Sequence, residues 1–485
     1  MGFGRAAGSA RESVALGPVS DEGLRQARDK MAAAGVAPVA IDVFEHYYRQ
    51  LEAGATGLIR EDTIDPLLDP PRLDAVEVTD DEAREALART VVIKLNGGLG
   101  TSMGMHAAKS LLPVRDGRTF LDLIVGQVRA ARSRWGVRLP LVLMDSFRTR
   151  EDTLAALSSY PDLALDGLPL DFLQSQEPKL LADDLTPVTW PKDPSLEWCP
   201  PGHGDIYPSL LSSGVLDALL DQGFRYACSS NADNLGAAPD ARIAGWFAAS
   251  GAPYAAELCR RTAADRKGGH LAIRTSDGRL ILRDTAQTAP EEMDYFTDTE
   301  HHPYFHTNNL WFDLRVLRNT LEERGGVLGL PLIRNEKHVD PSDKTSPEVV
   351  QLECALGAAI EVFEGATAIV VPRGRFLPVK TTNDLLLLRS DAYALHDDDT
   401  LSLTVDDAPL VELDPAYFQT ISAFDERFGA GAPSLRQATR LKVAGDVTFG
   451  AGVTIYGDVT VEGPVSVEDG ATLGHEEQPL RLPEV

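Results

Sequence analysis

The stretch VVIKLNGGLGTSMGMHAAK, residues 91–109, joins an apolar run to a glycine-rich segment. The apolar run over residues 91–95 predicts a short buried strand. The glycines that follow let the backbone turn sharply and bring N–H groups against an anion, and Lys109 adds a positive charge that could reach the same anion. The spacing matches neither GxGxxG nor the P-loop patterns GxxxxGKS and GxxxxGKT. An ordinary strand-to-helix turn therefore remains an alternative for this stretch taken alone.

The size and composition of the chain point to a globular protein with more than one domain. Its 485 residues are 43% hydrophobic, which is enough for a sizeable core. No run approaches the roughly 20 apolar residues of a membrane span, and the first residues lack the apolar core of a signal peptide. Its four cysteines form no CxxC pair, which argues against a disulfide frame and a zinc site. We expect a cytoplasmic protein with no membrane partner.

The formal net charge of −27 restricts the partners of the protein. Such a field disfavours DNA, RNA and acidic membrane surfaces, so we expect no nucleic-acid partner. A polyphosphate substrate must therefore meet a local positive charge or a metal ion. This requirement directs attention to the few lysines and arginines inside apolar or glycine-rich strings.

Alternating strands and helices are expected from residue 91 to about residue 395. After the first strand, the pattern predicts a helix over residues 120–134, a strand over 139–144 and a helix from about residue 150. This order is typical of an α/β fold of the Rossmann-like type, with a mixed, mostly parallel sheet and helices on both faces. Ligands of such sheets lie beyond the carboxyl ends of the strands, where the glycine-rich segment falls.

The two ends of the chain differ from this central part. Before residue 90 the apolar spacing predicts helices, and Thr79 with Glu82 resembles a capping box that opens the last of them; residues 1–18 look disordered. Near the C-terminus apolar residues recur every six positions, which is typical of a short left-handed parallel β-helix whose exposed end strand could form a homo-oligomer contact. The hexad series is Leu441, Val447, Val453, Val459, Val465 and Ala471. The expected domains are a helical segment (1–90), the α/β domain (91–395) and a C-terminal domain (396–485).

Four further strings accompany the glycine-rich one. They are PPGHGDIY (200–207), SNADNLGA (230–237), TNNLW (307–311) and FLPVKTTNDLLLLRSDAY (376–393). Together with LNGGLGTSMG, in this order, they resemble the UTP–glucose-1-phosphate uridylyltransferase family of the eukaryotic UDP-glucose pyrophosphorylase type. The similarity runs from about residue 85 to the C-terminus and implies a nucleotidyltransferase core.

The resemblance implies which residues contact the nucleotide. The family binds its nucleotide through the glycine loop, here Leu95, Asn96, Gly97, Gly98, Gly100 and Thr101. Gln174 matches a glutamine that bonds the base, and Gly202 matches a backbone contact to the base. An amide contact does not by itself dictate uracil over guanine. Without the resemblance, the two prolines and two glycines of PPGHGDIY favour a rigid turn in which His203 only caps a neighbouring group.

Three residues are expected to carry the chemistry. Asp233 follows a strand predicted over residues 225–228 and offers the carboxylate that Mg²⁺ prefers, although an Asx turn would look the same in sequence. Lys380 lies in an apolar segment where an ammonium needs an anionic partner, unless it is a snorkelling surface lysine. The resemblance implies a metal-handling aspartate at 233 and a catalytic phosphate-binding lysine at 380, with Lys109 beside them and Arg375 as an assistant.

The sugar side of the site departs from the family pattern at two positions. The resemblance implies that His203, Asn231, Asp284, His306 and Asn308 contact the sugar phosphate. Relatives usually carry a glutamate where this chain has Asp284, and FNTNN where it has His306 in FHTNN. These changes would move hydrogen bonds by about an ångström and favour a specialised substrate, such as valienol 1-phosphate with GTP. The alternative is that these two changes have no effect on which substrate binds.

The chemistry implied is an in-line attack of a sugar or cyclitol 1-phosphate on the α-phosphorus of a nucleoside triphosphate, with Mg²⁺ and release of pyrophosphate. The housekeeping alternative uses UTP and glucose 1-phosphate. A non-catalytic sugar-nucleotide binding protein is an alternative of another class, but binding alone would not need Lys109, Asp233 and Lys380 together. A dinucleotide-dependent oxidoreductase is disfavoured because its fingerprint is missing.

Overall fold

The computed structural model describes residues 21–262, 265, 268–475 and 480–481. The segment predicted to be disordered, residues 1–18, lies outside the described residues. None of the described helices is long and apolar enough to cross a membrane.

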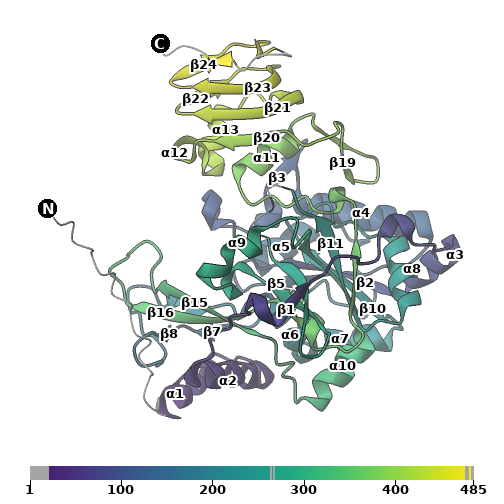
Figure 1. Cartoon of the computed structure of the whole chain (residues 1–485), viewed down its shortest axis with the longest axis vertical. Coiled ribbons are helices and arrows are strands. Elements are labelled where there is room, and N and C mark those ends of the chain that lie inside the picture. Colours follow the sequence, from purple (N-terminus) through teal and green to yellow (C-terminus); the bar gives the residue numbers. More distant parts are fainter. Residues whose placement is uncertain (1–20, 263–264, 266–267, 476–479, 482–485) are drawn as a thin grey trace.

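A mixed seven-stranded sheet forms the centre of the molecule (Figure 1). Four of its six strand pairings are parallel, and β14 is antiparallel to both of its neighbours. The sheet is therefore rich in parallel pairs, as the alternating pattern predicted. In spatial order the strands are β17 (Thr367–Val370), β11 (Tyr254–Arg260), β14 (Tyr304–Asp313), β10 (Tyr226–Asn231), β2 (Thr90–Asn96), β5 (Leu141–Asp145) and β6 (Asp171–Leu173).

Helices cover both faces of this sheet because its strands are apolar on both sides. In β2, Val91 and Ile93 pack into one core and Val92 into the other. The first core takes α1 (Asp21–Ala33), α2 (Pro38–Glu52), α6 (Ile206–Ser212), α7 (Val215–Asp221) and α10 (Leu314–Glu323). The second takes α3 (Asp80–Ala88), α4 (Phe120–Trp135), α5 (Arg150–Leu157), α8 (Ala241–Ser250) and α11 (Thr382–Arg389).

Local signals explain where several of these helices begin and end. Thr79 and Glu82 form the capping box predicted for α3, and Thr119 with Asp122 forms a second one for α4. Helix α4 ends at Gly136, which adopts a left-handed conformation. These signals fix the helix that follows the glycine loop.

Small sheets join the N-terminal segment to the rest of the chain. Strand β1 (Ile64–Pro66) pairs antiparallel with β12 (His270–Arg274), which in turn pairs with β13 (Leu280–Arg283). A second sheet contains β8 (Leu180–Leu181), β16 (Glu348–Cys354) and β15 (Leu332–His338). The first 90 residues therefore contribute a strand as well as helices.

The C-terminal strands stack in parallel beyond one end of the central sheet (Figure 1). In the pairs β22–β24 and β23–β25, and from Arg440 onward in β21–β23, paired residues lie 18 positions apart, as in Leu441 with Val459 and Val447 with Val465. Eighteen residues are three of the predicted hexads. The strands are β20 (Leu410–Leu413), β21 (Ser434–Ala444), β22 (Val447–Phe449), β23 (Thr454–Glu462), β24 (Val465–Val467) and β25 (Thr472–Leu473). Two short helices, α12 (Pro415–Phe418) and α13 (Ile421–Arg427), lie between β20 and β21.

Candidate active site

A cavity of about 300 Å³ lies at the carboxyl ends of β2, β5 and β10. Parallel strands place their carboxyl ends at one edge, so segments far apart in the sequence meet there. Ten of the residues singled out from the sequence line this cavity. They are Leu95, Asn96, Gly97, Gly98, Lys109, Gln174, Gly202, His203, Asn231 and Asp233.

The glycine loop is shaped by close approaches of the backbone. A side chain at Gly97 would lie 2.7 Å from the Oε1 atom of Gln174, so only glycine lets the Gln174 amide lie against the loop. Gly98 has open space on its side-chain face, and its carbonyl accepts a 2.9 Å hydrogen bond from the backbone N–H of Lys109. Gly100 is left-handed and starts the short turn that contains Thr101. Neither Gly100 nor Thr101 is among the residues that line the cavity.

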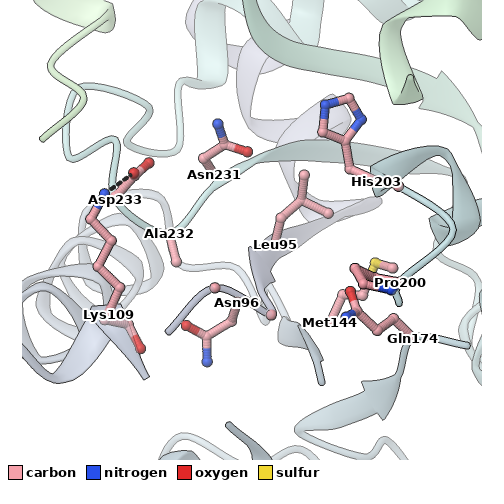
Figure 2. Close-up of a pocket in the computed structure, with 14 residues that line it drawn as sticks. Leu95, Asn96, Lys109, Met144, Gln174, Pro200, His203, Asn231, Ala232 and Asp233 are labelled. Carbon is pink, nitrogen blue, oxygen red and sulfur yellow. Dashed lines mark hydrogen bonds and ion pairs between the residues drawn. The ribbon is translucent and has the colours of Figure 1, made fainter. Parts of the chain in front are cut away.

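The Asn96 side chain points away from the cavity and is hydrogen-bonded inside the protein (Figure 2). Its Nδ2 donates to Asp145 at 2.6 Å and to Thr153 at 2.9 Å. Burial raises the pKa of Asp145 to about 6. Asn96 therefore anchors the start of the glycine loop through its side chain.

Lys109 and Asp233 lie together at one side of the cavity, and His203 lies at the other (Figure 2). The Nζ atom of Lys109 is 2.6 Å from Oδ2 of Asp233, and both side chains are less than one-fifth exposed. The Oδ1 atom of Asp233 is buried and has no hydrogen-bond partner among the described residues. Strand β10 ends at Asn231 and not at residue 228 as predicted, because Ser230 and Asn231 stay in register with β2.

Lys380 lies on a segment attached to the Asp233 loop. The backbone N–H of Val379 donates to the carbonyl of Asp233 at 3.2 Å, and the backbone N–H of Lys380 donates to Asp384 at 2.8 Å. Lys380 itself is exposed and does not line the cavity. The structure thus brings its backbone, but not its ammonium, against the site.

His203 is held in one tautomer by the backbone. Its Nδ1 accepts a 2.8 Å hydrogen bond from the N–H of Leu356, so Nε2 carries the proton and is free to donate. The ring is accessible from the cavity, yet the surrounding protein desolvates it and lowers its pKa. Gly202 has a φ of +80°, and a side chain there would meet the carbonyl of Cys354 at 2.6 Å.

Neither of the two residues that depart from the family pattern lines the cavity. His306 packs against Gly357, its Nδ1 accepts from the N–H of Asn308, and burial lowers its pKa to about 3. Asp284 caps the short turn Thr285–Gln287. Asn308 reaches the site indirectly: it has a φ of +61° and donates to Asn231 Oδ1 at 3.1 Å.

A second cluster of metal-binding side chains lies away from the cavity. Among the described residues, Glu61, His301 and His302 are close enough to share an ion, with both Nε2 atoms 3.0 Å from Oε1 of Glu61. The buried Arg283 already pairs with Glu61 and, at 2.6 Å, with Glu292. Because an arginine neutralises the carboxylate, we interpret the cluster as an ion-pair network that links the N-terminal segment to the loop before β14.

Four residues that line the cavity were not predicted as site residues from the sequence: Ser110, Met144, Pro200 and Ala232. Each lies next to a predicted residue or at the end of a neighbouring strand, and no chemical signal marks it. Lys94, a lysine in the middle of the apolar strand β2, was also not singled out from the sequence. A charged residue inside an otherwise apolar strand was the available signal.

The parallel-rich sheet, the glycine loop at its carboxyl edge and the Lys109–Asp233 pair define a nucleotide-binding α/β enzyme of the nucleotidyltransferase class. The family described as UTP–glucose-1-phosphate uridylyltransferase matches residues 41–456. The enzyme of that name from Solanum tuberosum is 41% identical over 379 residues, which cover 77% of either chain. The one from Saccharomyces cerevisiae is 40% identical over 375 residues, covering 76% of this chain and 73% of the yeast protein.

Solved structures agree with the sequence comparisons. A UDP-glucose pyrophosphorylase variant from Leishmania major in complex with UDP-glucose has a TM-score of 0.87 and 43% identity, with 95% of this chain and 99% of that chain covered. The chain therefore belongs to the UTP–glucose-1-phosphate uridylyltransferase family and is a nucleotidyltransferase. None of these relatives supports the specialised substrate that we expected from Asp284 and His306.

Proposed function

We propose that this protein makes UDP-glucose and pyrophosphate from UTP and glucose 1-phosphate. The observation that carries the proposal is the convergence of Gly98, Lys109 and Asp233 on one cavity. The chain shares about 40% identity with enzymes named for this reaction. These names support the housekeeping substrate pair.

The proposed mechanism needs no protein nucleophile. A phosphate oxygen of glucose 1-phosphate attacks the α-phosphorus of UTP, and the bond to the departing pyrophosphate breaks opposite it. Backbone N–H groups of the glycine loop and the ammonium of Lys109 neutralise charge on the triphosphate. Lys380 would reach the phosphates after the segment that follows Val379 moves toward the cavity. We assign the base to Gln174 and Gly202, which both line the cavity, and the Nε2 proton of His203 is available to a phosphate oxygen.

Asp233 is the residue that we propose as a Mg²⁺ ligand. Its Oδ1 atom is buried and unpartnered among the described residues, as expected of a carboxylate that accepts a cation. When bound, Mg²⁺ would supply charge neutralisation at the phosphates.

A substrate panel tests this function. Pyrophosphate release is measured with UTP, GTP and ATP, each against glucose 1-phosphate and a cyclitol 1-phosphate such as valienol 1-phosphate. We expect UTP with glucose 1-phosphate to give the highest kcat/KM. A preference for GTP with the cyclitol phosphate would replace the proposed substrates and leave the reaction class intact. Nucleotide binding without any turnover would favour the sugar-nucleotide binding protein.

We also propose a cytoplasmic location and a role for the C-terminal strands. All four cysteines are free, which suits a reducing compartment. The 18-residue register of the parallel strands supports a short left-handed β-helix, and its end strand offers a contact for a homo-oligomer. Light scattering on the purified protein measures the oligomeric state.

A further inference from the structure

Lys94 is a charged residue buried in the middle of the central sheet. It lies in β2, is 1% exposed and faces the same core as Val92. An ammonium in such a place is costly unless hydrogen bonds compensate it. Its Nζ donates to Ser230 Oγ at 2.8 Å and to the carbonyl of Ala237 at 2.9 Å.

The two partners of Lys94 mark the two ends of one loop. Ser230 is paired with Lys94 in the parallel register of β10 and β2, and Ala237 lies seven residues further on. Between them lie Asn231 and Asp233, which both line the cavity. The ammonium therefore closes the loop that carries Asp233.

The charge of Lys94 is not needed to balance its buried neighbours. Glu257 already receives two hydrogen bonds from Arg375, at 2.7 and 2.8 Å. Burial lowers the pKa of Lys94 to about 8, so the ammonium is still mostly charged at pH 7; Cys228, Glu257 and Asp233 act in the opposite direction. A surplus buried positive charge thus lies behind the loop of Asp233.

The same loop is attached to the segment that leads to Lys380. Asn234 accepts from the N–H of Leu377 at 2.8 Å, and the carbonyl of Asp233 accepts from Val379. A side chain at Gly236 would collide with the carbonyl of Gly374 at 2.4 Å, so the two segments are in direct contact. Movement of the loop would therefore move the Lys380 segment with it.

We propose that Lys94 is a positioning residue: by tying Ser230 to Ala237 it holds Asp233 in the cavity and keeps the segment before Lys380 against it. The inference rests on the proposed reaction for its turnover readout and on the proposed Asp233 metal site for its metal readout. A role in folding alone would leave the metal dependence unchanged.

The test compares Lys94→Met with a matched control. Lys179→Met also removes a buried ammonium, which donates to the carbonyl of Val339 at 3.0 Å, and neither of these residues lines the cavity. We expect Lys94→Met to lower kcat roughly 100-fold and to raise the Mg²⁺ half-saturation at least about fivefold, with the KM for UTP within about threefold. Lys179→Met should lose similar thermal stability and keep kcat and the Mg²⁺ half-saturation within about twofold.

Two further measurements keep the inference falsifiable. Ser230→Ala removes one acceptor and should shift kcat and the Mg²⁺ half-saturation in the same direction by a smaller factor. Mn²⁺ binding to the protein, followed by electron paramagnetic resonance, needs no turnover, so it tests Lys94 even if the wild type makes no UDP-glucose. A folded Lys94→Met protein with wild-type kcat and Mn²⁺ affinity would overturn the inference. If Lys94→Met fails to fold, unchanged Mn²⁺ affinity in Ser230→Ala would overturn it.

Discussion

The Nζ atom of Lys109 lies 2.6 Å from the Oδ2 atom of Asp233, so two groups that we assign to phosphate and metal are paired with each other. The ammonium of Lys109 must leave Oδ2 of Asp233 before it can contact a phosphate, whereas Oδ1 of Asp233 has no partner among the described residues and would be available to a cation. The same ion pair compensates both charges in a site where each is less than one-fifth exposed.

Lys109→Met should therefore have opposite effects on turnover and on metal binding. Loss of the ammonium from the triphosphate site should lower kcat by about 100-fold or more. Without nucleotide, Asp233 has lost its competing cation, so Mn²⁺ affinity should rise. Steady-state kinetics and Mn²⁺ titration measure the two effects, with the exposed Lys192→Met as the control. Weaker Mn²⁺ binding in Lys109→Met would argue against Asp233 as the metal ligand.

Lys380→Ala should separate chemistry from nucleotide binding. In the proposed mechanism the ammonium, which does not line the cavity in this structure, reaches the phosphates after its segment moves, and the variant lacks it. The backbone N–H of residue 380, which donates to Asp384, is kept in the variant. We expect kcat to fall by roughly 100-fold to 1000-fold, with UTP affinity within about threefold by calorimetry. The exposed Lys344→Ala is the control. Near-normal turnover in Lys380→Ala would remove Lys380 from the mechanism.

His306→Asn combined with Asp284→Glu should leave substrate choice unchanged. Neither side chain lines the cavity, and an asparagine oxygen could accept the Asn308 N–H that His306 Nδ1 accepts now. We expect the ratio of kcat/KM for UTP over GTP to change less than about threefold. With a pKa of about 3, His306 is neutral near pH 7, so its protonation should not contribute to the pH dependence of kcat/KM. A switch in preferred base or sugar phosphate would restore these residues as specificity determinants.

Asp205 should make stability depend on pH near neutrality. It is 3% exposed, and burial raises its pKa to about 7, although it accepts from the Ser175 N–H and the Ser209 hydroxyl. The folded protein therefore holds this proton more tightly than the unfolded chain, so stability is lost as pH rises from about 4 to about 7.

Asp205→Asn removes this dependence and keeps an acceptor oxygen. The free energy of unfolding of the wild type, relative to that of the variant, should fall by about 1 to 2 kcal/mol between pH 5.5 and pH 7. Urea denaturation at the two pH values measures it. A difference that stays constant with pH would show that Asp205 is ionised throughout the range.

Several strands and helix starts could be predicted from the sequence because they depend on residues that are close together in the chain. The apolar run became β2, the capping box at Thr79 opened α3, and α5 begins at Arg150 as expected. Strand β14 runs antiparallel between β11 and β10, and its order depends on pairing between distant segments. No local pattern carries that information.

The candidate site was predictable where glycines, charges and motif strings mark it. Asn96 lines the cavity, but the direction of its side chain depends on Asp145 and Thr153, which lie about fifty residues further along the chain. The packing of His306 behind Gly357 is equally a product of tertiary structure. A residue that matches a motif can therefore be placed near a site by sequence, while its contacts cannot.

Phosphorus NMR of the wild-type protein with UTP, glucose 1-phosphate and Mg²⁺ tests the central claim most directly. The proposed reaction predicts UDP-glucose and pyrophosphate in equal amounts, with no product after chelation of the metal. Unchanged substrates in the presence of bound nucleotide, or UTP hydrolysis without UDP-glucose, would contradict it.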